Sequence, residues 1–345
     1  MYHVHLIGAT GAVGQEILRL LEKGSFPIQH IRLFGSERSL GKKISFKNEE
    51  IPIELLDEKS FKGAHFAFFC AGSAISKQHI PLAVRQKVTV IDSSSYYRLD
   101  PTVPLVIPEI NLEALEYHSG IVSSPNCTAS IMLMALAPLH RRFQAKRVVA
   151  ATYQAASGGG AKLMRELELE TAAYLENRPF QRHFFPFPYA FNLFPHNSPL
   201  TDSGYCEEEI KMVEETKKIL QDDSLRITAT CVRVPVFRAH AIALNVQFEN
   251  DLSVEETYAI LQKTKGVTIF EDREKNRFAT PFDVSGKEGV FCGRVRKDLS
   301  QEKTIDLWVV GDQLLKGAAQ NAVQIFEALI HKQPEKSVSD GVVSH

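Results

Sequence analysis

One cysteine stands where a reactive thiol is expected. Cys127 lies in the run Ser123-Ser-Pro-Asn-Cys-Thr-Ala-Ser130, just before an apolar stretch with helical spacing. The sequence therefore places it in the first turn of a helix, where unpaired N–H groups and the helix dipole lower a thiol pKa and stabilise an oxyanion. A lone cysteine is more often a small buried hydrophobic residue, so a nucleophilic thiolate is predicted only together with suitable partners.

Candidate partners follow in the second half of the chain. Gln154 ends an apolar run and precedes the bend Ser157-Gly-Gly-Gly160, where its amide could orient a carbonyl or a water. Arg233 and His240 flank a Pro-containing bend and could supply a carboxylate clamp and a general acid/base. Each has a simpler alternative, because arginine is usually a solvated charge and a histidine among apolar residues is usually a core residue.

A glycine-rich motif lies near the N-terminus of the chain. The apolar run at 3–7 leads into Gly8-Ala-Thr-Gly-Ala-Val-Gly14, which begins a predicted helix. Glycines at this spacing allow a tight turn and bring backbone N–H groups close to a pyrophosphate, whose charge a helix N-terminus favours. The pattern is GxxGxxG rather than the commoner GxGxxG. Its place after the first strand still indicates a dinucleotide site rather than a simple packing turn.

The second predicted strand ends in Phe34-Gly-Ser-Glu-Arg-Ser39. An NAD-binding protein usually carries an acidic residue here for the ribose 2′-hydroxyl, whereas Ser36 and Arg38 suit a 2′-phosphate. The sequence therefore favours NADP over NAD. Glu37 weakens this preference, and Arg38 as an ordinary solvated charge is the alternative.

Two patterns of secondary structure carry these residues. In the first third, strands are predicted at 3–7, 31–34, 64–70, 88–91 and 121–123, with helices at 12–23 and 74–85. Such alternation is typical of a doubly wound parallel sheet, a Rossmann-type domain. A helix from Cys127 to about Leu139 then precedes longer alternating strands at 147–154, 226–234, 239–248, 289–295 and 304–310. They favour an α+β catalytic domain with a largely antiparallel sheet covered on one face.

The expected organisation is therefore α/β with two main domains. We place an NADP-binding domain at 1–126, a catalytic domain at 127–312, and a C-terminal helix at 313–333 that packs back on the first domain. The polar residues 334–345 are expected to form a disordered tail. The Pro- and Phe-rich segment Arg182–Ser203 predicts a long loop.

Composition narrows the range of ligands. The 345 residues carry 40 Lys+Arg against 41 Asp+Glu, which leaves no broad electrostatic footprint for nucleic acid or an anionic membrane. The chain start lacks a secretory leader pattern, and no stretch approaches about twenty uninterrupted apolar residues. We expect a soluble, cytoplasmic protein with small-molecule ligands. The five scattered cysteines support neither a disulfide scaffold nor a metal site.

Seven motifs, in order, resemble the aspartate-semialdehyde dehydrogenase family and cover nearly the whole chain. They are GATGAVG, the stretch from SSSYYR to VPLVIPEIN at 93–111, SPNC, YQAASGGG, EEEIK, RVPVFRAH and LKGAAQNAVQI. The resemblance implies reductive dephosphorylation of L-aspartyl-4-phosphate to L-aspartate-4-semialdehyde with NADPH and release of phosphate. It also implies a step towards lysine, threonine and methionine, and a homodimer built through the second domain.

The resemblance also implies roles for individual residues. Cys127 is the nucleophile that forms a thioester, Gln154 positions the intermediate, and His240 acts as acid/base. The implied substrate-binding residues are Arg98 and Lys211 for the phosphate, Glu208 for the amino group, Arg233 for the α-carboxylate, and Asn126 beside Cys127. The implied cofactor-binding residues are Gly8, Thr10, Gly11, Ala12, Val13, Ser36, Arg38, Ser157, Gly158 and Asn321, the last near the nicotinamide carboxamide. Taken alone, Glu208 and Lys211 would be a surface pair on a helix.

The chain departs from the family pattern at five positions. Gly159 replaces a commoner Ala, Ala239 and Ala241 flank His240 in place of Gly and Ser, and Gln313 and Leu315 replace Asn and Arg. These changes bear on rate, cofactor preference and partner contacts more than on reaction class.

Two alternatives stay open. One is an enzyme like N-acetyl-γ-glutamyl-phosphate reductase, which shares the acyl-phosphate and cysteine chemistry but has a different nucleophile motif. The other is a catalytically silent NADP-binding protein, against which the retention of Cys127, Gln154, Arg233 and His240 speaks.

Overall fold

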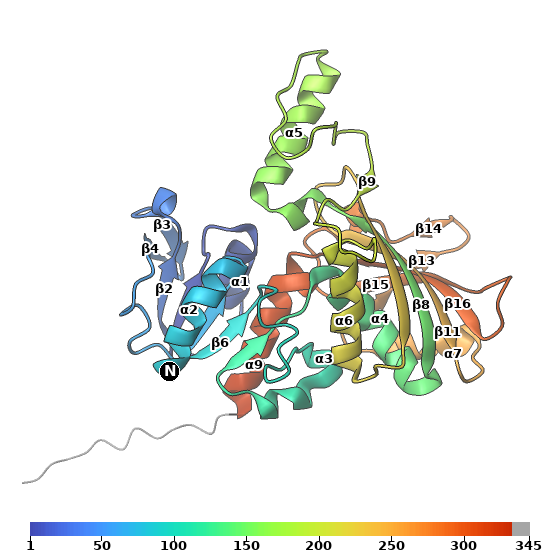
Figure 1. The fold of residues 1–345 in the computed structure, drawn as a ribbon, viewed down its shortest axis with the longest axis horizontal. Helices are drawn as coiled ribbons and strands as arrows, with labels where there is room; N and C mark the ends of the chain where they lie inside the picture. Colours follow the sequence, from blue (N-terminus) through green and yellow to red (C-terminus); the bar gives the residue numbers. More distant parts are fainter. Residues whose placement is uncertain (333–345) are drawn as a thin grey trace, which may run out of the picture.

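The computed structural model describes residues 1–332, in which two seven-stranded sheets lie side by side (Figure 1). The first sheet has the order β3-β4-β2-β1-β5-β6-β7. Its strands are β1 (Tyr2–Ile7), β2 (Ile28–Phe34), β3 (Lys43–Phe46), β4 (Glu49–Glu54), β5 (Phe66–Phe69), β6 (Thr89–Asp92) and β7 (Ile121–Ser123). All neighbouring strands run parallel except β3 and β4. The doubly wound parallel sheet predicted from the sequence is confirmed.

Alternation along β1 explains why helices cover both faces of this sheet. Val4 and Leu6 join a hydrophobic cluster with α1 (Ala12–Lys23) and α9 (Gln320–Lys332), whereas Ile7 joins a second cluster with α2 (Ser73–Arg85). The C-terminal helix therefore returns to the first sheet, as predicted. It is preceded by a π-helical turn, η4 (Leu315–Ala319), which the sequence did not reveal.

The hairpin β3–β4 was missed by the sequence analysis. Its two-residue turn has positive φ at both Lys47 and Asn48, 48° and 67°, which suits the twist of a tight hairpin. The strands lie at the edge of the sheet, are rich in charged residues and include Pro52, so they lack the apolar run that marked the inner strands. The predicted strand at 31–34 also begins earlier, at Ile28.

The second sheet has the order β12-β15-β16-β11-β8-β10-β9. Its strands are β8 (Ala145–Gln154), β9 (Phe194–Pro195), β10 (Arg226–Arg233), β11 (His240–Phe248), β12 (Val267–Ile269), β15 (Val290–Lys297) and β16 (Thr304–Gly311). It is antiparallel except for the pairs β8–β10 and β12–β15. The five strands predicted here all occur, with ends within two residues of the prediction.

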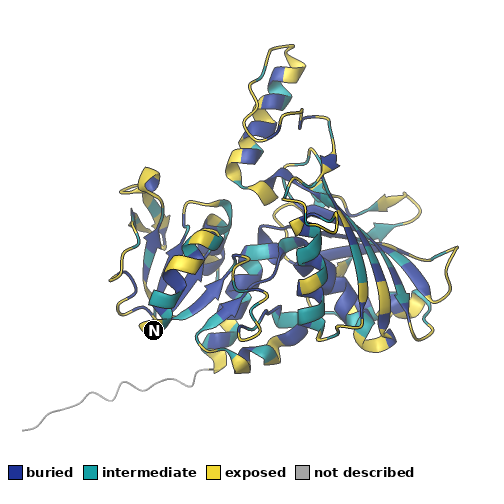
Figure 2. Cartoon of the chain, viewed as in Figure 1, coloured by how far each residue is buried: buried dark blue, intermediate teal, exposed yellow. Residues whose placement is uncertain are grey.

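One face of the second sheet is covered by helices. The helices α4 (Cys127–Phe143), α6 (Glu207–Leu220) and α7 (Val254–Lys263) share a single large hydrophobic cluster with its strands. The α4 helix is one turn longer than predicted from the sequence. The opposite face carries residues of intermediate burial along β8, β11 and β16 (Figure 2). Val149, Asn245 and Trp308 are examples.

Helix α5 (Ala161–Leu175) projects away from both sheets (Figure 1). It shares a small hydrophobic cluster with Phe185, Tyr189 and Phe194 of the following segment. The long loop predicted at 182–203 is confirmed, apart from the two residues of β9. The remaining short elements are η1 (Glu37–Ser39), α3 (Pro108–Asn111), η2 (Leu112–Tyr117), η3 (Ala156–Gly159), β13 (Glu271–Asp272), β14 (Arg277–Phe278) and α8 (Pro281–Val284).

The predicted disordered tail at 334–345 lies outside the described residues. Within residues 1–332, no helix combines the length and apolar character needed to cross a membrane.

Candidate active site

The N-terminus of α4 presents Cys127 to a cavity between the two sheets. Asn126 caps the helix, since its side-chain oxygen accepts hydrogen bonds from the backbone N–H groups of Thr128 (2.9 Å) and Ala129 (3.2 Å). Cys127 is the first helical residue and keeps a partly exposed surface. The predicted position of the thiol at a helix N-terminus is confirmed.

A cavity of about 410 Å³ gathers all of the predicted catalytic and substrate-binding residues. They are Cys127, Gln154, His240, Arg98, Asn126, Glu208, Lys211 and Arg233. Val13, Ser157 and Gly158, predicted to bind the cofactor, line the same cavity. Residues that lie far apart in the sequence therefore meet where the ends of β8 and β10, the start of α4 and the first turns of α6 converge.

Glu208 is the hub of the polar contacts in the cavity. Its Oε1 accepts from Asn126 Nδ2 (2.8 Å) and Gln154 Nε2 (3.3 Å), and its Oε2 lies 3.7 Å from Lys211 Nζ. Burial opposes ionisation of this carboxyl, but His196 and the bond from Asn126 lower its pKa below the ordinary value. The Glu208–Lys211 pair is therefore part of the site and not the simple surface pair that helical spacing alone suggested.

Arg98 is held by a carboxylate that the sequence analysis missed. Its Nη1 lies 3.1 Å from Glu215 Oε1, and its Nε and Nη2 donate to the carbonyl oxygens of Ser124 and Ser93. Burial raises the pKa of Glu215, which also accepts from the backbone N–H of Asn126 (2.5 Å). Glu208 and Glu215 are seven apart on α6 and so share one helix face, a signal that could have found the second residue.

The thiol pKa departs from the sequence-based expectation. Burial, and then the charge of Glu208, raise the pKa of Cys127 to about 12, although Arg233 and Arg98 act in the opposite direction. The helix N-terminus was expected to lower this pKa. The net shift is opposite to that prediction, because desolvation of a thiolate outweighs the favourable charges around it.

His240 is buried with one nitrogen engaged and one free. Its Nδ1 accepts from the backbone N–H of Ala155 (2.9 Å), so in the neutral ring the proton lies on Nε2. This Nε2 is buried and has no partner among the described residues. Burial, and then the charge of Arg233, lower the pKa of His240 to about 3. At neutral pH the cavity therefore holds a neutral imidazole beside a neutral thiol.

Two of the departures from the family pattern touch one another. Ala239 has φ of 72°, a left-handed conformation that favours glycine, and its backbone N–H donates to Gln313 Oε1 (2.9 Å). The Gln313 amide also donates to the hydroxyl of Ser157. Gln313 thus secures the strained residue just before His240 and links it to the glycine-rich bend.

The turn after β1 has the shape of a dinucleotide cradle. Gly8 has φ of 93°, and a Cβ there would lie 2.8 Å from the carbonyl oxygen of Cys70. Gly11 is the N-cap of α1 and offers no side-chain cap, which leaves the first N–H groups of that helix available to a pyrophosphate. The residues present therefore fit a dinucleotide.

The end of β2 lies beside this turn. Thr10 Oγ1 is 3.4 Å from the Oγ of Ser39, the last residue of the short helix η1. Ser36 is the N-cap of this helix and Arg38 lies within it, and both are exposed. The predicted 2′-phosphate residues are thus placed next to the turn of Gly8, Thr10, Gly11 and Ala12.

Asn321 lies apart from the cavity. It is fully buried, its Nδ2 donates to the carbonyl oxygen of Val106 and to Ser124 Oγ (both 2.9 Å), and its Oδ1 accepts from Lys316 Nζ (3.0 Å). It ties α9 to the first domain, and its role at the nicotinamide stays a prediction. The cavity also includes His196, which the sequence analysis missed because a histidine in a loop without periodicity gives no signal.

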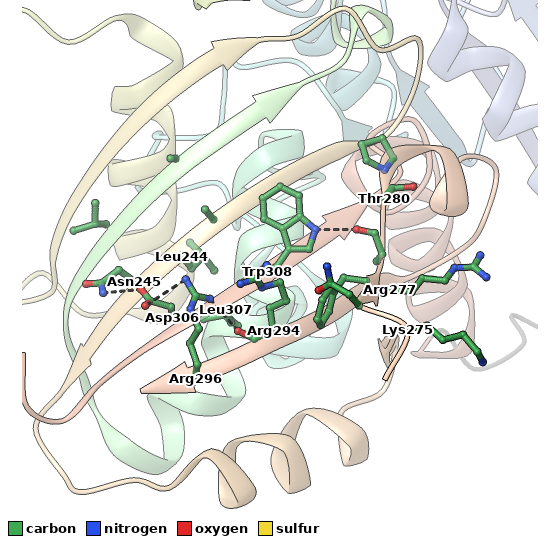
Figure 3. A pocket seen from close by; sticks show the side chains of 17 residues that line it. Leu244, Asn245, Lys275, Arg277, Thr280, Arg294, Arg296, Asp306, Leu307 and Trp308 are labelled. Carbon is green, nitrogen blue, oxygen red and sulfur yellow. Dashed lines mark hydrogen bonds and ion pairs between the residues drawn. The ribbon is translucent and has the colours of Figure 1, made fainter. Parts of the chain in front are cut away.

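A larger hollow, of about 940 Å³, lies elsewhere. It is on the open face of the second sheet, where Trp308 donates to the carbonyl oxygen of Ala279 (2.8 Å) among arginine and lysine side chains (Figure 3). Of the candidate site residues in the described chain, none lines this hollow. In residues 1–332 no cluster of His, Cys, Asp or Glu is arranged to hold a metal ion.

Comparison with protein families defines the class. Residues 3–118 match the NAD-binding domain of semialdehyde dehydrogenases, and residues 136–316 match the dimerisation domain of the same enzymes. Together with the cysteine-bearing cavity between the sheets, these matches define an oxidoreductase that acts on an aldehyde with a nicotinamide cofactor.

Individual relatives narrow the class. The chain is 47% identical over 329 residues to the aspartate-semialdehyde dehydrogenase of Synechocystis sp., covering 95% of this chain and 97% of that one, and 39% identical to that of Bacillus subtilis over 95% and 97%. Aspartate-semialdehyde dehydrogenase II of Vibrio cholerae, solved in complex with ASA, superposes with a TM-score of 0.94 at 38% identity over 97% of this chain and 99% of that one. The chain belongs to the aspartate-semialdehyde dehydrogenase family.

A more distant structure shows the fold alone. Aspartate-semialdehyde dehydrogenase of Candida albicans, solved with NADP, has a TM-score of 0.73 at 22% identity over 96% of this chain and 98% of that one.

Proposed function

We propose that this protein is a cytoplasmic aspartate-semialdehyde dehydrogenase that reduces L-aspartyl-4-phosphate to L-aspartate-4-semialdehyde with NADPH, in the biosynthesis of lysine, threonine and methionine. The observation that carries the proposal is the single cavity at the start of α4, where a thiol, an amide and an imidazole meet with three cationic side chains. A catalytically silent protein would have no use for this convergence of reactive groups.

The charges of the cavity suit a substrate with an amino group, a carboxylate and a phosphate. Arg233 has a buried Nε without a partner in the described chain, so its guanidinium is ready to pair with the α-carboxylate. The carboxylate of Glu208 pairs with the substrate amino group and accepts hydrogen bonds from it. Lys211 and Arg98 hold the phosphate, although Glu215 already neutralises part of the charge of Arg98. Asn126 supports Glu208 from the cap of α4.

Cys127 carries the covalent step. Its sulfur attacks the acyl carbon, and the bond from that carbon to the phosphate oxygen breaks. The departing phosphate takes up the thiol proton and leaves as hydrogen phosphate, whose charge Lys211 and Arg98 hold. Gln154, whose Nε2 is anchored on Thr128 Oγ1 (3.0 Å), orients the thioester. NADPH, when bound, supplies the hydride that reduces this thioester. His240 then acts as acid/base and hydrogen-bonds the substrate oxygen through Nε2, while the N-terminus of α4 stabilises negative charge.

The turn at Gly8–Val13 would hold the dinucleotide, and Ser157 and Gly158, which line the cavity of Cys127, would lie at its nicotinamide end. Ser36 and Arg38 bind the 2′-phosphate, which makes NADP the preferred cofactor. Arg38→Ala is therefore expected to weaken NADPH binding much more than NADH binding, measured by fluorescence titration. Arg85→Ala is the matched control, because this exposed arginine ends α2 at the opposite edge of the sheet. An equal effect of Arg38→Ala on both cofactors would remove the 2′-phosphate role.

The open face of the second sheet is where we place the homodimer contact. Apolar residues that line its hollow include Ala151, Ala243 and Trp308, the last of which is labelled in Figure 3. The match to a dimerisation domain supports a second copy as its partner. Sedimentation of the full chain is expected to give the mass of two copies, and a monomer would contradict this part of the proposal.

The deciding experiment is phosphate-dependent reduction of NADP with L-aspartate-4-semialdehyde, which runs the reaction in reverse. Cys127→Ala is expected to abolish turnover and leave NADPH binding nearly intact. The control Cys292→Ala removes a cysteine from the core of the second sheet and should keep activity. Activity of Cys127→Ala like that of the wild type would refute the covalent route. Turnover of N-acetyl-glutamate semialdehyde in its place would favour the related reductase.

A further inference from the structure

His196 occupies a place in the cavity that none of the roles above uses. It follows the two-residue strand β9, in which Phe194 pairs with Arg233 of β10. The backbone N–H of His196 continues the pairing by donating to the carbonyl oxygen of Cys231 (2.8 Å). The imidazole lines the cavity beside Arg233 and Glu208. Strand pairing therefore fixes His196 next to the guanidinium that is ready to bind a carboxylate.

The ring of His196 is held in one tautomer. Its Nδ1 accepts from the backbone N–H of Ser198 (3.2 Å) and lies 3.1 Å from Ser198 Oγ. This hydroxyl oxygen already accepts from the backbone N–H of Glu208 (3.1 Å), so its own hydrogen is free to point at Nδ1. Since Nδ1 is an acceptor, the neutral ring must carry its hydrogen on Nε2.

The Nε2–H of His196 is an unused donor at the cavity. Within the part of the chain that the structure describes, Nε2 of His196 donates no hydrogen bond, and both contacts of the ring involve Nδ1. Burial, and then the charge of Arg233, lower the pKa of His196 to about 4, so the ring is neutral at physiological pH. It thus offers a hydrogen bond without placing a second positive charge beside Arg233.

We propose that His196 is a specificity residue that donates a hydrogen bond from Nε2 to the substrate carboxylate bound by Arg233. A carboxylate has about four lone-pair sites, of which a guanidinium fork occupies two, so a further neutral donor completes its coordination. Glu208 is a less suitable partner, because Oε1 already accepts from Asn126 and Gln154, and Oε2 faces Lys211. The inference rests on the proposed function, whose substrate supplies the carboxylate.

The test compares His196→Phe with His196→Gln in the phosphate-dependent oxidation of L-aspartate-4-semialdehyde. Phenylalanine keeps the ring shape without the donor, whereas glutamine keeps an N–H at similar reach. A hydrogen bond to a charged group accounts for about a ten- to hundredfold change in affinity. We expect His196→Phe to raise the KM for the semialdehyde by this factor, with kcat and the KM values for phosphate and NADP little changed. His196→Gln should recover most of the loss.

A substrate without the carboxylate separates this role from a structural one. With 3-aminopropanal, which lacks that group, His196→Phe and the wild type should have the same kcat/KM. An equal loss with both aldehydes, a rise in the KM for phosphate instead, or a glutamine variant as impaired as the phenylalanine variant would overturn the inference. Absence of semialdehyde oxidation by the wild-type enzyme would instead overturn the proposed function itself.

A measurement on the wild-type protein keeps the inference testable if His196→Phe fails to fold. Imidazole ¹⁵N spectra, with His196 assigned by its absence from His196→Gln, should show hydrogen on Nε2 and no titration between pH 8 and about 5, one unit above a pKa of about 4. Hydrogen on Nδ1, or titration near pH 6.5, would overturn it.

Discussion

Gly158 leaves the space in which two catalytic groups sit. A Cβ at this position would lie 2.9 Å from Arg233 Nη1 and 3.2 Å from both Cε1 and Nε2 of His240. Carbon contacts are comfortable at about 3.5 Å or more, so Gly158→Ala must displace these atoms by about 0.3 to 0.6 Å. Arg233 and His240 are only 6% and 1% exposed, which leaves them little room to retreat.

The expected loss in Gly158→Ala follows from this displacement. Overpacking of a buried site costs about 1–3 kcal/mol of stability, and misplacing reacting groups by about 1 Å costs about a hundredfold in rate. We therefore expect kcat/KM for semialdehyde oxidation to fall by about ten- to hundredfold, because Arg233 and His240 lose their joint alignment.

The neighbouring glycine provides the control. The three atoms nearest to a Cβ at Gly159 all belong to the side chain of Leu163, which is not among the residues that line the cavity. Gly159→Ala should therefore lower the thermal unfolding temperature about as much as Gly158→Ala, while its kcat/KM stays near that of the wild type. Wild-type kcat/KM in Gly158→Ala, or an equal loss in Gly159→Ala, would refute the reasoning from contact distances.

Two further predictions concern titrating groups. Burial lowers the pKa of His5 to about 4, so the stability that the neutral ring contributes is complete above about pH 6.5 and is lost as the pH falls towards 4. Between pH 7 and 5 the free energy of unfolding, measured in urea, should therefore fall by about 2 kcal/mol more in the wild type than in His5→Phe. Equal losses in the two proteins would contradict this. Burial, and then the charge of Glu208, raise the pKa of the Cys127 thiol. Glu208→Gln removes this charge and should therefore shift the pH–rate profile of Cys127 alkylation to lower pH. An unchanged profile would show that Glu208 does not raise the thiol pKa.

Signals confined to neighbouring residues predicted much of the fold and site. The turn at 8–14, the cysteine at the start of α4 and the alternation of the long strands could be recognised because each depends on backbone geometry within a few residues. The hairpin β3–β4 gave no such signal, because an exposed edge needs little apolar surface. The placement of Asn321 was equally hidden, since the face that α9 turns to the core is decided by the sheet it packs on.

The direction of the thiol pKa could not be predicted for a different reason. A helix N-terminus is a local feature, whereas the burial of Cys127 and its proximity to Glu208 arise only when α6 packs beside α4. Sequence reasoning included the stabilising dipole and omitted the cost of removing the thiolate from water. For buried ionisable groups, that cost is commonly the larger effect.

Under the proposed mechanism, binding of the substrate carboxylate to Arg233 also changes the pKa of His240. After burial, Arg233 is the largest cause of the lowered pKa values of both His240 and His196, because its guanidinium lies unpaired at Nε near both rings. A carboxylate bound to Arg233 cancels much of that positive charge, so the pKa of His240 rises and the ring holds a proton more readily. His240 would then become ready for acid/base chemistry only once the substrate carboxylate is bound. An aldehyde without a carboxylate would leave Arg233 uncompensated and should therefore lose kcat as well as affinity.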